Sequence, residues 1–138
     1  MDSAPRIQMN SQVAQLLDKV KGDEAVLSVL LFGSHARDEE TPKSDIDLCL
    51  VLPPGREGRA EQTAVRMAYL EDSSGRLRIH VFQQLPLYVR RRVLKEGVVL
   101  VCRDWDTLYK IAHRTAQAFE DFKPIYRSYL DQVDHVGS

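Results

Sequence analysis

The chain is poor in cysteine, proline and glycine, and it carries almost no excess of charge of either sign. Its 138 residues include two Cys, six Pro and seven Gly, with 19 Lys and Arg against 20 Asp and Glu. This composition, with 43% hydrophobic residues, excludes disordered, collagen-like and coiled-coil classes. Because the net charge is only −1, binding to long nucleic acid without sequence preference has no overall electrostatic support.

Long apolar runs and an export signal are also missing. The longest apolar runs, residues 26–32 and 48–52, are far too short to cross a bilayer. The first residues do not combine a basic stretch with an apolar one, so we expect no export. Cys49 and Cys102 lie within apolar stretches, where a cysteine is more often a small buried hydrophobe than half of a disulfide. These features predict a cytoplasmic protein with no membrane partner.

The spacing of apolar residues predicts a single domain over residues 1–138, built from four helices and four strands. The segments with helical spacing are 13–20, 57–70, 86–96 and 104–133. The segments with strand patterns are 25–32, 45–52, 76–82 and 98–102. Their order along the chain predicts an α/β (α+β) fold, in which helices pack on a small mixed β-sheet. We expect a core over about residues 10–102 and a C-terminal helical segment over about 104–133.

Three of the helices indicate which side chains share a face. In the first, the apolar residues on one face are Val13, Leu16, Leu17 and Val20. In the second, the residues expected on one face are Ala64, Met67 and Ala68. In the last, the stripe consists of Leu108, Ile111, Ala112, Thr115, Phe119 and Phe122. Asp104 can cap this last helix, and Pro124 is expected to kink it or to begin a new one.

The segment most informative about function joins the first two predicted strands. The chain turns at Gly33 and Ser34, where glycine lets a ligand approach the backbone and N–H groups can bind phosphate. Ten residues later, Asp45 and Asp47 open the second strand, whose geometry puts both carboxylates on one face, about 6.5–7 Å apart at Cα. Two acids on one face repel each other, and Mg²⁺ bound together with substrate phosphates removes that penalty. The pattern predicts a site for a metal-bound nucleoside triphosphate.

This pattern resembles the DNA polymerase β-type nucleotidyltransferase superfamily. The matching residues are Gly33-Ser34, Ala36-Arg37 and Ser44-Asp45-Ile46-Asp47-Leu48. More narrowly, they resemble the minimal nucleotidyltransferases, many of which are the antitoxin partners of HEPN-domain toxins (the MntA-like group). Residues 86–97 are similar to a segment that these proteins carry after their third strand, so the resemblance covers about residues 10–102.

The resemblance implies a polymerase β-like nucleotidyltransferase core that transfers AMP from Mg-ATP to a tyrosine hydroxyl of a HEPN-type toxin, as a type VII antitoxin. Asp45 and Asp47 would hold Mg²⁺, two ions in the usual arrangement, while Gly33, Ser34 and Ser44 would bind the nucleotide. Two roles stay open for Arg37, a contact to the triphosphate and a position on the surface. The expected partners are ATP and the toxin, in a hetero-oligomer, with no direct contact to nucleic acid.

The sequence departs from this family at one catalytic position. Active members carry a third carboxylate on the following central strand, and that position holds Arg78 or His80, depending on register. Three interpretations stay open. His80 can replace the acid as a base, since imidazole titrates close to neutral pH. Alternatively it is a structural histidine, or the third position is lost and the site binds metal-nucleotide with little or no transfer.

Two other functions are consistent with the same residues. A catalytically impaired nucleotidyltransferase-fold binding module would neutralise the toxin by direct contact, with a vestigial nucleotide site. A transferase acting on a small molecule such as an aminoglycoside usually needs a substrate domain, for which 138 residues leave little room. The basic residues 90–92 and Lys95 are interpreted as a solvated helix face.

Overall fold

The computed structural model describes residues 11–33, 36, 45–71 and 76–137, and its elements follow the predicted order. The helices are α1 (Ser11–Lys21), α2 (Arg59–Leu70), the short 3₁₀ helix η3 (Phe82–Gln84), α3 (Leu87–Glu96) and α4 (Trp105–Gly137). The strands are β1 (Ser28–Phe32), β2 (Ile46–Val51), β3 (Leu77–Val81) and β4 (Val98–Cys102). The predicted mixed α/β fold is confirmed.

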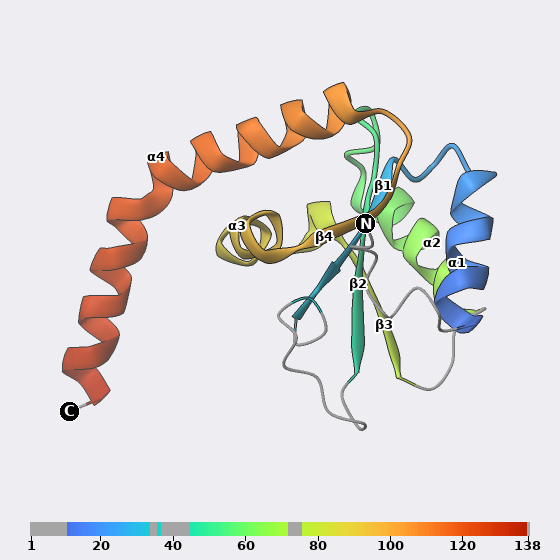
Figure 1. Cartoon of the computed structure of the whole chain (residues 1–138). Helices are drawn as coiled ribbons and strands as arrows, with labels where there is room; N and C mark the ends of the chain where they lie inside the picture. Colours follow the sequence, from blue (N-terminus) through green and yellow to red (C-terminus); the bar gives the residue numbers. More distant parts are fainter. Residues whose placement is uncertain (1–10, 34–35, 37–44, 72–75, 138) are drawn as a thin grey trace.

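The strands of the described residues form one mixed sheet in the order β3-β2-β1-β4. β1 pairs antiparallel with both β2 and β4, whereas β2 and β3 run parallel and are joined through α2. Figure 1 shows α1 and α2 on one side of the sheet, and α3 and α4 on the other. The central strands are therefore covered on both faces, which explains their nearly continuous apolar sequences. β1 starts at Ser28 rather than at residue 25, because the Val26 N–H turns back to the Asp23 carbonyl.

Two apolar clusters, one on each face of the sheet, make up the core. Buried members of the first cluster include Val13, Leu16, Leu31, Leu48 and Tyr69. Buried members of the second include Leu30, Cys49, Val51, Phe82, Val93 and Leu108. Neighbouring residues of β2 belong to opposite clusters, Leu48 to the first and Cys49 to the second, which confirms the predicted alternation. Both cysteines are free, and burial raises the pKa of the Cys49 thiol.

α2 buries a different face from the predicted one. All three residues of the predicted face are exposed, namely Ala64, Met67 and Ala68. Gln62 and Tyr69 are buried instead, and their polar groups are satisfied. The Gln62 amide donates to the Arg56 carbonyl at 2.8 Å, and the Tyr69 hydroxyl donates to Asp23 at 2.8 Å. The prediction was wrong because these hydrogen bonds let polar side chains occupy the core face, which an apolar pattern does not reveal.

The last helix, α4, continues through Pro124, so this residue begins no new helix. Figure 1 shows a bend within α4, and a proline, which removes one backbone hydrogen bond, is the usual cause of such a kink. Within the predicted stripe, Leu108 and Thr115 are buried, whereas Phe122 is 38% exposed. Burial of the stripe therefore decreases along the helix. Even with this long helix, the described part of the chain contains none that combines the length and apolar character needed to span a membrane.

A single guanidinium ties the end of α1 to the start of the sheet. Arg103, which follows β4, donates from Nη2 to the carbonyls of Val20, Lys21 and Asp23 at 2.7, 3.2 and 3.0 Å. Its Nε donates to the Val26 carbonyl at 3.3 Å. The carbonyls of the last helical turn have no partners within α1. Arg103 therefore satisfies the C-terminal end of α1 and positions it next to β1.

Replacing Arg103 by Met should lower the free energy of unfolding by about 1.5–3 kcal/mol, the usual contribution of hydrogen bonds to a charged group. Arg103→Lys should recover only part of this loss, because an ammonium group lacks the fixed fork that reaches several carbonyls. Urea unfolding followed by circular dichroism measures both variants, with Arg92→Met on the exposed side of α3 as the control. An unchanged unfolding midpoint for Arg103→Met would contradict this role.

The predicted cap of α4 is present and makes stability depend on pH. Asp104 Oδ1 accepts hydrogen bonds from the N–H groups of Asp106 and Thr107, and Oδ2 accepts one from the Thr107 hydroxyl. These bonds, first that of the Thr107 hydroxyl, lower the pKa of Asp104 below its ordinary value. A lowered carboxyl pKa stabilises the fold above the ordinary pKa, and this contribution is lost as the pH falls through the lowered value.

Asp104→Ala should accordingly lower Tm at neutral pH and have a smaller effect as the solution is acidified below the ordinary carboxyl range. Asp104→Asn keeps a capping side chain without a titrating group, so its Tm should exceed that of Asp104→Ala by an amount that does not depend on pH. Thermal melts of the three proteins from neutral to acidic pH measure these differences. A constant gap between the natural chain and Asp104→Ala would refute the coupling.

Candidate nucleotide and metal site

The candidate site begins at the end of β1, where Gly33 has a backbone conformation that other residues rarely adopt. Its φ is +79°, in the left-handed region. A Cβ atom at this position would lie 2.7 Å from Oδ2 of Asp47, closer than side chains pack. Phe32, the preceding residue, stands opposite Asp47 in the β1–β2 register. The site therefore needs glycine for two reasons, the backbone angle and the carboxylate that lies against it.

Asp45 and Asp47 share a face at the start of β2. Asp47 lies on the side of Cys49, and its side chain is 24% exposed. Asp45 directly precedes the strand and is 38% exposed. The Ala36 N–H donates a hydrogen bond to the Gly33 carbonyl at 3.1 Å. The other predicted nucleotide contacts, which lie outside the described residues, are Ser34, Arg37 and Ser44.

The neighbouring strand places two basic side chains against these carboxylates. In the parallel β2–β3 register, Asp47 stands opposite Arg78, and Cys49 stands opposite His80. An ion pair joins Arg78 Nη2 to Asp45 Oδ2 at 2.6 Å, and His80 Nε2 lies 3.4 Å from Asp47 Oδ1. In both contacts, the basic residue of β3 reaches the aspartate two positions before its register partner on β2. Both positions considered for a third carboxylate therefore face the aspartates and are basic.

His80 is held within the site by contacts on two sides. Its ring packs edge-on against Phe32, with 5.4 Å between the ring centroids, and its side chain is 30% exposed. Its Nε2 also lies within hydrogen-bonding distance of Asp47 Oδ1, at 3.4 Å. This geometry excludes a structural role remote from the carboxylates. Roles as a base or as a support for Asp47 are both compatible with it.

The donor set of the site suits a divalent cation that arrives with phosphates. Mg²⁺ prefers oxygen ligands and usually binds through one or two carboxylates together with substrate phosphates. Asp45 and Asp47 supply two carboxylates, each partly exposed. Among the residues that the structure describes, no group of three or more His, Cys, Asp and Glu side chains could hold a metal ion. Substrate phosphates and water are the further ligands that Mg²⁺ usually takes beside such carboxylates.

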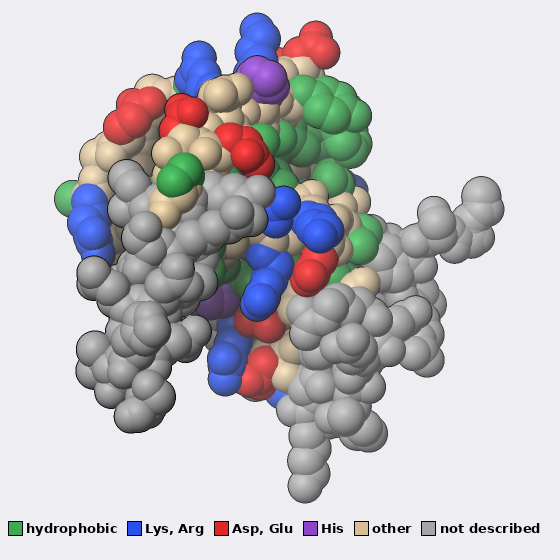
Figure 2. Space-filling model, turned by 90° about the vertical axis from the view of Figure 1, so that its left-hand side faces the viewer, with side chains coloured by type: hydrophobic (Ala, Val, Ile, Leu, Met, Phe, Trp, Pro, Cys, Tyr) green, Lys and Arg blue, Asp and Glu red, His purple; other side chains and the backbone are tan. Residues whose placement is uncertain are grey.

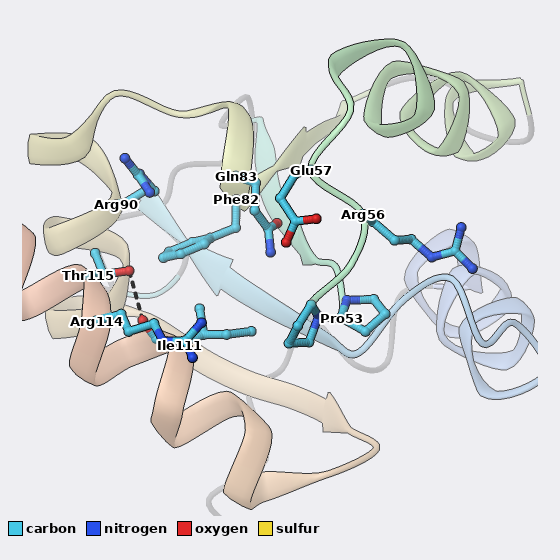
Figure 3. A pocket seen from close by; sticks show the side chains of 10 residues that line it. Pro53, Arg56, Glu57, Phe82, Gln83, Arg90, Ile111, Arg114 and Thr115 are labelled. Atoms are coloured by element: carbon cyan, nitrogen blue, oxygen red, sulfur yellow. Dashed lines mark hydrogen bonds between the residues drawn. The ribbon is translucent and has the colours of Figure 1, made fainter.

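A separate pocket of about 180 Å³ lies beyond the other end of β2 (Figure 3). It is formed by the β2–α2 connection, η3, α3 and α4, and its lining includes Pro53, Phe82, Arg90, Ile111 and Arg114. Burial lowers the pKa of Arg90 on its α3 wall. Neither aspartate of the candidate site contributes to this lining, so the pocket is distinct from the site.

Charges of both signs are mixed on the side of the molecule that α3 and α4 occupy. Figure 2 shows Lys and Arg side chains next to Asp and Glu side chains down the middle of this surface. The predicted solvated basic face of α3 is found only in part. Arg92 is exposed, but Arg90 is half-buried and Arg91 stacks on the Phe119 ring at 4.6 Å. Arg91 and Lys95 are nonetheless exposed, so Arg90 is the residue that departs from the predicted solvated face.

The sequence analysis missed two contacts of the site, the ion pair of Arg78 with Asp45 and the packing of Phe32 on His80. A signal for Arg78 was available, because it alternates with the buried side chains of β3 and so shares a face with His80. The missing information was the register between β2 and β3. Register decides which carboxylate each basic side chain can reach.

The mixed sheet and the glycine bend beside a carboxylate pair agree with a nucleotide-transferring protein. The chain belongs to the nucleotidyltransferase domain family, which matches residues 13–100. A curated relative from Methanocaldococcus jannaschii, called protein adenylyltransferase MJ1547, is 35% identical over 78 residues. The match covers 54% of this chain and 55% of the relative, so the chain spans about half the length of that relative.

Solved structures share the fold over most of the chain. A chain of a toxin–antitoxin crystallised with AMP-PNP has a TM-score of 0.67 at 15% identity, covering 89% of this chain and 96% of that chain. A chain of the complex between a tri-AMPylated Shewanella oneidensis HEPN toxin and MNT antitoxin has a TM-score of 0.61 at 14% identity, covering 88% and 98%. The predicted nucleotidyltransferase family is therefore confirmed, and these structures confirm the fold.

Gly33→Ala and Gly55→Ala form a matched pair for testing the site. Both glycines have a positive φ, +79° and +96°, so either substitution should cost about 1–2 kcal/mol of stability. Only at Gly33 would the added Cβ meet a neighbour, since nothing lies within 4 Å of the corresponding point at Gly55. Gly33→Ala should therefore also displace the Asp47 carboxylate and weaken Mg-ATP binding by about tenfold or more.

Denaturant unfolding measures the stability of both glycine variants, and calorimetric titration with Mg-ATP measures their affinities. Equal Mg-ATP affinities for the two folded variants would mean that the contact between residue 33 and Asp47 does not shape the binding site.

Proposed function

We propose that this protein transfers AMP from Mg-ATP to a tyrosine hydroxyl of a HEPN-type toxin and so acts as a type VII antitoxin. The observation that carries the proposal is the approach of the Gly33 backbone to the Asp47 carboxylate, which joins a phosphate-binding bend to a metal-binding pair. Membership of the nucleotidyltransferase family, the relative called an adenylyltransferase, and the fold shared with a chain from an AMPylated toxin complex support it.

In the proposed site, the side chains of Asp45 and Asp47 hold Mg²⁺ together with the triphosphate. Gly33 and Ser34 bind its phosphates, with Arg37 and Ser44 as further contacts to the nucleotide. The metal ion supplies positive charge that stabilises the leaving pyrophosphate. We further propose that residues 1–138 act as a single domain and that the reaction takes place in the cytoplasm, where ATP is available.

The proposed transfer forms one bond and breaks one. The tyrosine oxygen attacks the α-phosphorus of ATP, the bond from this phosphorus to the bridging oxygen breaks, and pyrophosphate leaves. The hydroxyl proton needs an acceptor, and we assign this role to Nδ1 of His80, with the ring's Nε2 donating to Asp47 Oδ1, 3.4 Å away. Asp47 would orient the imidazole through this contact.

A second function, a binding module that neutralises the toxin by contact alone, is favoured by one observation. Arg78 takes the side of the site where a third carboxylate is expected, and it pairs with Asp45 at 2.6 Å. A protein impaired in transfer could still bind its toxin. We favour transfer because the Arg78 side chain is 63% exposed, and such an exposed ion pair is weak enough to open when a metal ion competes for Asp45.

Incubation with labelled ATP, Mg²⁺ and a purified HEPN-type toxin distinguishes the two functions. The natural chain should label a tyrosine of the toxin, and Asp47→Asn should reduce the rate by at least about 100-fold, as expected when one electrostatic contact to the transition state is lost. Asp18→Asn, on the exposed side of α1, is the matched control and should label at the natural rate. Neutralisation of the toxin without label, equally by the natural chain and by Asp47→Asn, would establish the binding module instead.

A further inference from the structure

The basic side chains beside Asp45 and Asp47 set the charge of the candidate site, and this charge limits how many cations the site can hold. A site with three carboxylates has enough negative charge and enough ligands for two divalent ions. Here two carboxylates share their face with the cationic guanidinium of Arg78. Among the described residues a second divalent ion would find no third carboxylate, and it would be repelled by the positive charge of Arg78.

The two carboxylates are held to different degrees. Asp47 is 24% exposed, lies against the Gly33 backbone and has His80 Nε2 at 3.4 Å. Asp45 is 38% exposed, and its Oδ2 is engaged by Arg78, whose own side chain is 63% exposed. An ion pair as exposed as this contributes little to stability, so a competing cation can replace Arg78 at small cost. Asp47 is therefore the fixed ligand of the site, and Asp45 is the ligand that exchanges.

From this geometry we propose that the site binds a single divalent cation, which arrives with the nucleoside triphosphate and displaces Arg78 from Asp45. After displacement, Arg78 stays on the same face of β3, and its charge acts on the triphosphate in place of a second ion. Without nucleotide, Arg78 competes with metal ions for Asp45. The inference rests on the proposed function, because it concerns the same site. It adds how many ions the site binds and names Arg78 as the residue that determines this number.

Counting bound Mn²⁺ by electron paramagnetic resonance tests this without measuring transfer. With saturating AMP-PNP, the natural chain should bind one Mn²⁺, and without AMP-PNP it should bind Mn²⁺ only weakly. Arg78→Gln should bind Mn²⁺ alone about three- to tenfold more tightly, since a competing exposed ion pair is removed, and should bind AMP-PNP more weakly. Arg78→Asp supplies the missing carboxylate and should bind two Mn²⁺ with AMP-PNP.

Arg59→Gln is the matched control for the loss of one arginine. Arg59 is exposed at the start of α2, beyond the other end of β2 from the two aspartates, so its Mn²⁺ binding should equal that of the natural chain. Circular dichroism checks that each variant is folded. We expect the Arg78 variants to fold because this exposed residue alternates with the buried side chains of β3.

Two Mn²⁺ ions per natural chain with AMP-PNP would overturn the single-ion proposal while leaving the nucleotide site intact. An unchanged Mn²⁺ affinity in Arg78→Gln, or a single Mn²⁺ in Arg78→Asp, would equally remove Arg78 as the residue that sets the number of ions. If no variant bound AMP-PNP with Mn²⁺, the proposed function itself would fail. The AMP-PNP titration therefore separates the two failures.

Discussion

The close approach of the Asp47 carboxylate to the Gly33 backbone is the constraint on which the rest of the candidate site depends. It occurs where the two central strands of the sheet meet, with Phe32 of β1 opposite Asp47 of β2. Both strands are packed on both faces, by clusters that include Leu31 on one side and Cys49 on the other. Because such close-packed interiors resist displacement, the core fixes the backbone of Asp47, from which its carboxylate reaches Gly33.

This rigidity at Asp47 contrasts with the exposed ion pair at Asp45. A metal-nucleotide site needs at least one ligand that does not move, so that binding energy is not spent on ordering it. It also needs a route by which the ion can enter. Asp47, supported by the sheet and by His80, meets the first need, whereas Asp45, with its exposed Arg78 partner, meets the second.

The order of the elements and the face of β2 that carries Asp47 could be predicted because they depend on local periodicity. Leu48 and Cys49 are neighbours in sequence, and strand geometry alone sends them to opposite sides. The buried face of α2 could not be predicted in this way. Tyr69 is buried because its hydroxyl reaches Asp23, 46 residues earlier, and Arg78 meets Asp45 only through the register of two parallel strands. Both depend on contacts between distant parts of the chain.

The basic side chains on β3 also show why fold and chemistry must be argued separately in this family. β3 buries Leu77, Ile79 and Val81, and its packing depends on these three apolar side chains. Arg78 and His80 alternate with them, point to the site and are partly exposed. An acidic or a basic residue at either position therefore leaves the core unchanged. The fold therefore places no requirement on the charge at Arg78 and His80. In the functions that we propose, that charge, together with the aspartate pair, sets how many ions the site accepts and which side chain takes the proton.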